Sequence, residues 1–185
     1  LWVVGANFGL HAVTAKLLHP TARVLAFEPS PLMAARVLEN AALNGIEIEL
    51  HTTALADAIG ILPFHANATG NPGMSTLHPV PGLVYDHRFN VATTTAAAVI
   101  EGGHGPAPTV LLVDAEGAEE SVLRGFGPHL ARSELRRIVF EAENDLLTGP
   151  DALHALVTGA GFRIEKLVRH EQTAHALSNF LGTRQ

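Results

Sequence analysis

Acidic residues directly follow three apolar runs that have the length of buried strands. They are Glu28, Asp114, Glu116 and Glu141, which come after residues 23–27, 110–113 and 136–140. Ligands of open α/β sheets bind in the crevice at the carboxyl ends of the strands, so we expect these carboxylates to face a shared site. A carboxylate there can accept hydrogen bonds from a ligand hydroxyl, take up a proton, or bind a hard cation.

A turn with two glycines stands near the start of the chain, between an apolar run and an amphipathic helix. Residues 1–4 are typical of a buried parallel strand, Gly5 and Gly9 bound a sharp turn, and residues 11–18 have apolar residues at helical spacing. This arrangement places free backbone N–H groups where a nucleotide-like ligand can approach the main chain. An ordinary tight turn is the alternative.

Glu28 lies 19 residues after Gly9, at the strand-end position from which an acid accepts hydrogen bonds from both ribose hydroxyls. Pro29 keeps Glu28 out of helical geometry, and Ser30 and Pro31 have the residue types of an N-cap and a first helical position. A solvated glutamate at a turn is the alternative. The pairing with the glycine turn favours the ribose interpretation.

Further along, residues 32–43 predict a helix and residues 46–51 a third strand. In such a sheet the small residues just past this strand, Ala54 and Leu55 among them, lie along an adenine. Asp57 we expect to cap a turn.

The composition limits the partners and the chemistry. The 185 residues are 47% hydrophobic and 16% charged, which predicts one packed domain over residues 1–185. The net charge of −6, without a Lys/Arg stripe, argues against nucleic acid, and the lack of cysteine excludes disulfides and Cys-ligated zinc. No apolar run approaches the ~20 residues of a membrane span, and we expect a cytoplasmic protein. Because Leu1 already lies in a predicted strand, we also expect that preceding residues were trimmed.

Residues 58–90 interrupt the alternation of strands and helices, with short extended pieces expected at 61–65 and from residue 89 onward. Glycines and prolines punctuate residues 67–90, and an irregular segment of this length is usually a functional lid or a disordered loop. Its apolar residues should not face water permanently, so we expect a lid that closes over bound ligands. They are Met74, Leu77, Val80, Leu83, Val84 and Tyr85. A partner-binding or homodimer-forming loop is the alternative.

The remaining chain completes the pattern of a doubly wound, mostly parallel α/β sheet. Helices are expected at 96–101 and 151–158, and strands at 110–113, 136–140, 162–168 and 176–181. Only seven residues separate the last two strands. That connection is too short for a parallel crossover, so the last strand should run antiparallel.

Five segments resemble, in order and spacing, the FkbM-type methyltransferases, a family that uses S-adenosylmethionine. They are Val-Gly-Ala-Asn-Phe-Gly at 4–9, Ala-Phe-Glu-Pro-Ser-Pro at 26–31, Leu-Asn-Gly at 43–45, Val-Asp-Ala-Glu-Gly-Ala-Glu at 113–119 and Val-Phe-Glu at 139–141. The resemblance implies a Rossmann-like methyltransferase fold with seven strands in the order 3-2-1-4-5-7-6. It also implies methyl transfer from S-adenosylmethionine, most often to a hydroxyl, here of a small molecule or a carbohydrate.

The same resemblance implies positions for the site. Asp114 and Glu116 match the family's second signature. By motif match, Gly5, Asn7, Gly9 and Glu28 resemble the family's cofactor contacts. We expect Ala6, Pro29, Ala54, Leu55 and Asp114 to contact the cofactor as well. Two residues depart from the family's pattern: Val3 stands where an acid is usual, and Leu112 where a lysine is usual. This is either a compensated change to apolar packing or the mark of a degenerate site that binds cofactor without catalysis.

An NAD-dependent oxidoreductase is a third hypothesis. The turn lacks the middle glycine of the dinucleotide-binding Gly-x-Gly-x-x-Gly pattern. An acidic pocket better suits S-adenosylmethionine, which has no phosphate and carries a sulfonium.

A hydroxyl acceptor benefits from a general base. The candidates are His78 and His87 in the expected lid, together with Asp114 and Glu116. Asp114, Glu116 and Glu141 could also hold Mg²⁺ or Ca²⁺. Capping and contact with a cationic cofactor explain these acids equally well, and we expect no metal.

Overall fold

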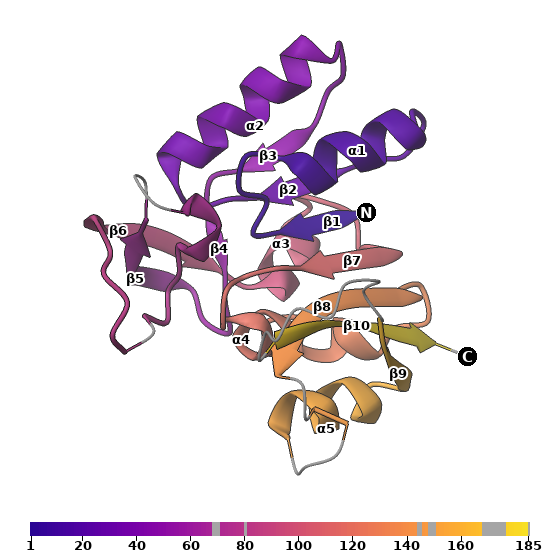
Figure 1. Cartoon of the computed structure of the whole chain (residues 1–185). Helices are drawn as coiled ribbons and strands as arrows, with labels where there is room; N and C mark the ends of the chain where they lie inside the picture. The colour runs from indigo at the N-terminus through magenta and orange to yellow at the C-terminus, as the bar shows by residue number, and fades with distance from the viewer. Residues whose placement is uncertain (68–70, 80, 144–145, 148–150, 168–176, 185) are drawn as a thin grey trace.

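A seven-stranded sheet forms the centre of the computed structural model, which describes residues 1–67, 71–79, 81–143, 146–147, 151–167 and 177–184. The strand order is β3-β2-β1-β7-β8-β10-β9 (Figure 1). The strands are β1 (Trp2–Val4), β2 (Leu25–Phe27), β3 (Glu49–His51), β7 (Val110–Val113), β8 (Arg137–Glu143), β9 (Phe162–Lys166) and β10 (Leu177–Arg184). Since β7 to β10 are the fourth to seventh strands of this sheet, the expected order 3-2-1-4-5-7-6 is confirmed.

The strand directions also agree with the sequence. β1 pairs in parallel with β2 and β7, β2 pairs in parallel with β3, and β7 pairs in parallel with β8. β10 is antiparallel to both β8 and β9. The carboxyl ends of β1, β2 and β7 therefore meet at one edge of the sheet.

Helices cover both faces because side chains alternate along each strand. Val4, Phe27 and Val113 point into the larger core, against α3 (Ala96–Glu101), α4 (Glu119–Arg124) and α5 (Ala152–Gly159). Val3 and Ala26 point the other way, into a smaller core under α1 (Leu10–Leu18) and α2 (Pro31–Leu43). Figure 1 shows these two layers on opposite sides of the sheet.

The expected start of α2 is confirmed. The Ser30 hydroxyl accepts a hydrogen bond from the Met33 N–H at 3.5 Å, and Pro31 is the first helical residue.

The interruption after residue 58 is more ordered than expected. β4 (Ala54–Leu55), β5 (Gly60–Ala66) and β6 (His87–Thr94) form a small sheet of order β4-β6-β5, which lies to the left in Figure 1. Residues 87–90, the end of the segment expected to be a lid, belong to β6 and pair with β5. A short 3₁₀ helix, η1 (Pro72–Met74), lies between β5 and β6, and η2 (Gly127–Ala131) follows α4.

Some boundaries differ from the sequence prediction. β3 begins at Glu49 rather than residue 46, and β8 continues past Glu141 to Glu143. The second difference has a clear cause: the antiparallel partner β10 extends the ladder to a Leu177–Glu143 pair, whereas β7 stops at Val113 opposite Phe140. Glu141 thus lies within a strand. Residues 168 and 176, expected in the last two strands, are outside the described residues, as is Val80 of the expected lid.

Among the described helices, none has both the length and the apolar character that crossing a membrane requires.

Candidate functional site

A cavity lies at the carboxyl ends of β1, β2 and β7, between the large sheet and the small one; we call it the main cavity. It encloses about 560 Å³ of empty space, part of it open to solvent. Most of the residues predicted for the site line it: Gly5, Asn7, Glu28, Pro29, Ala54, Leu55, Asp114 and Glu116. Ala6 and Gly9, predicted as contacts, are outside this lining.

The glycine turn is shaped by its contact with β7. Gly5 has φ 74°, and a Cβ built on it would lie 1.8 Å from the carbonyl oxygen of Asp114. Only glycine tolerates both the positive φ and this approach. Gly9, at φ 92°, lies close to Val37 of α2, where an added Cβ would meet the Cα at 3.3 Å. Gly9 therefore sets helix packing.

Four backbone N–H groups of the turn have acceptors within the protein, whereas the sequence predicted free N–H groups here. Gly5 and Ala6 both donate to the carbonyl of Phe27 at 3.0 Å, and Gly9 donates to Ala6 at 2.8 Å. Asn7 donates to the carboxylate of Glu28 at 2.7 Å. At these four positions a phosphate would lack the donors that dinucleotide-binding turns provide.

Glu28 is 5% exposed, and its carboxylate faces the main cavity. Oε2 accepts from the Asn7 N–H and Oε1 from the Ser30 N–H at 2.8 Å. Burial raises the pKa of Glu28, and the hydrogen bonds from Ser30 and Asn7 oppose that rise. Because an ionised carboxylate accepts about four hydrogen bonds, Glu28 keeps capacity for the two hydroxyls of a ribose.

Asn7 contributes a further unsatisfied acceptor. Its φ is 50°, and its side-chain Oδ1 is buried without a hydrogen-bond partner among the described residues. A buried acceptor of this kind calls for a donor. Asn7 lines the main cavity, but less than 1 Å² of its Oδ1 is accessible, so a ligand in the cavity does not reach this oxygen in the present geometry.

The turn after β7 carries the second group of acids. Glu116 has φ 49°, a backbone conformation that is uncommon for a residue with a side chain. The carboxylate of Glu119, an acid in the first turn of α4, accepts hydrogen bonds from the N–H groups of Ala115 at 2.8 Å and Gly117 at 3.0 Å. Glu119 is 7% exposed and holds this turn from the α4 side.

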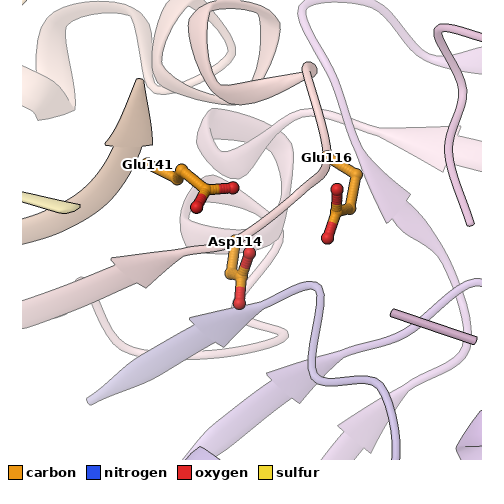
Figure 2. A group of neighbouring side chains, drawn as sticks. All are labelled: Asp114, Glu116 and Glu141. Atoms are coloured by element: carbon orange, nitrogen blue, oxygen red, sulfur yellow. The ribbon is translucent and has the colours of Figure 1, made fainter. Parts of the chain in front are cut away.

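Three carboxylates converge beside this turn. One oxygen each of Asp114, Glu116 and Glu141 lies within 4.8 Å of the others, and Figure 2 shows their side chains directed into a common space. Burial, followed by the charges of Asp114, Glu141 and Glu119, raises the pKa of Glu116 from 4.5 to about 7. Glu116 can therefore accept a proton near neutral pH.

The two histidines proposed as bases lie elsewhere. His87 is exposed on β6, opposite Ala66. His78 is exposed beside Gly117, where a Cβ built on the glycine would be 3.9 Å from the His78 Cβ. Neither lines the main cavity.

A second cavity, which we call the side cavity, lies against the face of β7 and β8 on the α1 side. It has about 770 Å³ of empty space, part of it open to solvent. His11, Asp114, Glu141 and Asn179 provide polar groups, and Leu112, Val139 and Leu167 provide an apolar wall. Asp114 lines both cavities, so two ligands could meet beside this residue.

The two departures from the expected family pattern are direct neighbours. Val3 and Leu112 are paired in the β1–β7 register, and both side chains belong to the smaller core, where Val3 is fully buried. An acid and a lysine at these positions would face each other. Two apolar residues in their place pack without an unpaired charge, which fits a compensated change.

Sequence reasoning missed two residues that cover the main cavity, Met33 of α2 and Phe64 of β5. Gly73, Ser75 and Leu77, which also cover it, belong to the expected lid segment. No Lys, Arg or His is among the described residues that line the main cavity. With the carboxylates of Glu28, Asp114 and Glu116 in its lining, the cavity suits a cationic ligand that donates hydrogen bonds. These residues fit S-adenosylmethionine and do not fit a pyrophosphate.

Comparison with known proteins also indicates a methyltransferase. The family model described as Methyltransferase FkbM domain matches residues 4–164. The chain is 31% identical over 128 residues to the hexuronic acid methyltransferase AglP of Haloferax volcanii, a match that covers 68% of this chain and 48% of AglP. It is 36% identical over 78 residues to the 31-O-demethyl-FK506 methyltransferase FkbM of Streptomyces tacrolimicus, covering 41% of this chain and 29% of that protein. The matches therefore span about half or less of these relatives' lengths.

A solved structure supports the fold. The precorrin-6y C5,15-methyltransferase of Geobacter metallireducens superposes with a TM-score of 0.55 at 16% sequence identity, over 100% of this chain and 78% of that chain.

Proposed function

The chain belongs to the FkbM methyltransferase family, and we propose that it transfers a methyl group from S-adenosylmethionine to a hydroxyl of a small molecule or a sugar. The observation that carries this proposal is the main cavity, which is lined by three carboxylates and lacks cationic side chains among its described lining. Bound S-adenosylmethionine would supply a methyl group activated by a sulfonium. Glu28 would hold the ribose, and Ala54 and Leu55 the adenine.

Glu116 is the general base in this proposal. Its raised pKa of about 7 lets its carboxylate take the proton from the acceptor hydroxyl as the oxygen gains the methyl group. Asp114 lies beside Glu116 and lines both cavities. Positioning of acceptor and cofactor supplies most of the remaining rate enhancement.

The acceptor would approach from the side cavity, which meets the main cavity at Asp114. Its polar groups can bond to several hydroxyls, while Leu112, Val139 and Leu167 can contact the apolar face of a sugar ring. No Lys or Arg is among the described side-cavity residues, and three carboxylates converge nearby. A neutral hydroxyl acceptor therefore fits better than an acceptor carboxylate, which these acids would repel.

We further propose a single domain over residues 1–185 with a lid that begins at residue 67. The support is that Gly73, Ser75 and Leu77 of this segment line the main cavity. A homodimer, a cytoplasmic location and the lack of a nucleic-acid partner stay predictions.

Calorimetric titration with S-adenosylhomocysteine and, separately, with NAD⁺ tests the cofactor. Binding of S-adenosylhomocysteine alone supports the proposal, and binding of NAD⁺ alone overturns it. Transfer of radiolabelled methyl from S-adenosylmethionine to methyl glucoside or to glucuronate then tests the acceptor class. Labelling of the neutral glycoside separates an active enzyme from a degenerate domain, and labelling of glucuronate as an alkali-labile ester would contradict the hydroxyl acceptor.

A further inference from the structure

Thr76 fastens the segment between β5 and β6 to the small sheet. Its backbone N–H donates to the His65 carbonyl at 2.9 Å, and its carbonyl accepts from the His65 N–H at the same distance. Thr76 is 2% exposed. It is therefore a fixed point of the small sheet within an otherwise irregular segment.

The hydroxyl of Thr76 reaches out of the small sheet to the turn that carries the acids. Oγ1 donates to the backbone carbonyl of Glu116 at 2.7 Å and accepts from the His78 N–H at 2.8 Å. The His78 N–H can only donate, so the hydroxyl proton is directed at Glu116. The residues joined by this bond are 40 positions apart in sequence.

The turn needs such support. Glu116 has φ 49°, a sparsely populated conformation for a residue with a side chain, which persists where surrounding contacts hold it. Glu119 holds the N–H groups of Ala115 and Gly117 from one side. Thr76 holds the carbonyl of Glu116 itself from the other side.

We propose that Thr76 is the positioning residue of Glu116: its hydroxyl ties the small sheet to the turn after β7 and keeps the Glu116 carboxylate in the main cavity. This inference rests on the proposed function, in which Glu116 is the general base. The link itself is a property of the turn. It couples the segment that covers the cavity to Glu116, so that a displacement of the segment around Thr76 also displaces Glu116.

The charged surroundings of Glu116 give the link a measurable consequence. Glu28 lines the same cavity, and His78 lies beside Gly117 on the small-sheet side. The titratable groups whose charges act on Glu116 are Asp114 after β7, Glu141 on β8 and Glu119 on α4, and all three repel its ionised form. Without the Thr76 bond the turn can relax away from them, and the pKa of Glu116 should fall toward its ordinary value.

The experiment compares Thr76→Val with Thr76→Ser and with a matched control. Thr93→Val is the control because Thr93 is also a buried threonine of the small sheet, 4% exposed, whose hydroxyl donates to a backbone carbonyl, that of Ala58 at 2.9 Å. Each purified variant is measured for thermal unfolding, for affinity to S-adenosylhomocysteine by calorimetry, and for the Glu116 titration by ¹³C-carboxyl NMR. The Glu116 signal is assigned with Glu116→Gln.

Thr76→Val should weaken S-adenosylhomocysteine binding about five- to tenfold, the effect of losing one hydrogen bond that orders a cavity wall. It should also lower the Glu116 titration midpoint. Thr76→Ser, which keeps the hydroxyl, and Thr93→Val should both stay close to the wild type in these two measurements. Thr76→Ala against Thr93→Ala makes the same comparison if valine at position 76 prevents folding.

The inference would be overturned if the valine substitutions at positions 76 and 93 changed the affinity and the Glu116 titration midpoint equally. It would also be overturned if Thr76→Ser did not restore the wild-type values. If the wild-type protein does not bind S-adenosylhomocysteine, the proposed function fails. The NMR titration still decides whether Thr76 positions Glu116, so the two failures are distinguishable.

Discussion

The backbone N–H of Asn7 donates to the carboxylate of Glu28 at 2.7 Å, so the glycine turn after β1 and the acid after β2 form one unit. The acid thereby orients the turn, and the turn fixes the oxygen that can accept from a ribose. Changes at either residue should affect cofactor binding together.

Glu28→Ala should weaken S-adenosylhomocysteine binding by ~1.5–3 kcal/mol, the scale of a hydrogen bond to a charged group. Calorimetric titration of the variant and the wild type with S-adenosylhomocysteine measures this loss of affinity. Glu49→Ala is the control, since Glu49 is an exposed acid at the start of β3, paired with Arg23, away from the carboxyl ends of the strands. Unchanged affinity in Glu28→Ala would rule out the ribose role.

Gly5→Ala should destabilise the protein more than Gly45→Ala does. Both glycines have positive φ, 74° and 64°, but only at Gly5 does an added Cβ collide, 1.8 Å from the Asp114 carbonyl oxygen. We expect about 1 kcal/mol for the backbone strain at Gly45 and at least about 3 kcal/mol at Gly5, where the collision adds to the strain. Urea unfolding measures both. Equal losses would mean that the contact between the turn and β7 is not tight in solution.

Glu116→Gln should stabilise the protein above neutral pH. The pKa of Glu116 is about 7 in the folded protein against an ordinary 4.5, so its protonated form favours folding. That contribution is complete below about pH 4.5 and is lost as pH rises through about 7. At about pH 8.5 the neutral glutamine should add about 1–2 kcal/mol, after a reduction for solvent screening of the half-exposed carboxylate.

Urea unfolding across this pH range gives the comparison. Glu120→Gln is the control, because Glu120 is exposed and paired with Arg124 on the same helix. A stability difference between Glu116→Gln and the wild type that does not change with pH would contradict the raised pKa.

Methyl transfer should survive dialysis against EDTA. The oxygens of Asp114, Glu116 and Glu141 lie close enough for a cation, yet the attraction of these acids for a sulfonium accounts for the same arrangement. The measurement is turnover before and after dialysis, with and without added Mg²⁺ or Ca²⁺. Loss of activity that either ion restores would establish a metal site.

Residues 71–79 should gain protection from hydrogen exchange when S-adenosylhomocysteine and an acceptor are added, at any protein concentration. Gly73, Ser75 and Leu77 line the main cavity, so a bound ligand should restrict this segment. Exchange followed by mass spectrometry gives the result, with the amides of α5, which does not line the main cavity, as an internal control. Protection that depends on protein concentration and ignores ligand would make the segment an oligomer contact.

The sequence was sufficient for the framework of the site, because short-range patterns determine it. The apolar run before Gly5, the acid after residues 23–27 and the Ser30–Pro31 cap are all readable locally, and strand order followed from the family resemblance. Glu28 and Asp114 were found because strand ends converge in any sheet of this class.

Long-range contacts could not be predicted in the same way. Glu119 has the signature of an ordinary first-turn acid, and only the fold shows that it accepts from Ala115 and Gly117. Thr76 carries no local signal at all, since its partner is 40 residues away. The extension of β8 past Glu141 depends on the late strand β10, which no pattern around Glu141 could indicate.

The pairing of β1 with β7 also determines at which stage of folding the main cavity can form. Trp2 pairs with Leu111, and the Gly5 turn packs against Asp114. The main cavity can therefore form only after the long loop between β1 and β7 has closed. Closing so long a loop is an entropic cost that comes before any contact compensates it. During synthesis on the ribosome, a chain that has not yet released residues 110–118 lacks one wall of the main cavity. We therefore expect a ligand of this cavity to stabilise only nascent chains in which β7 has already joined the sheet.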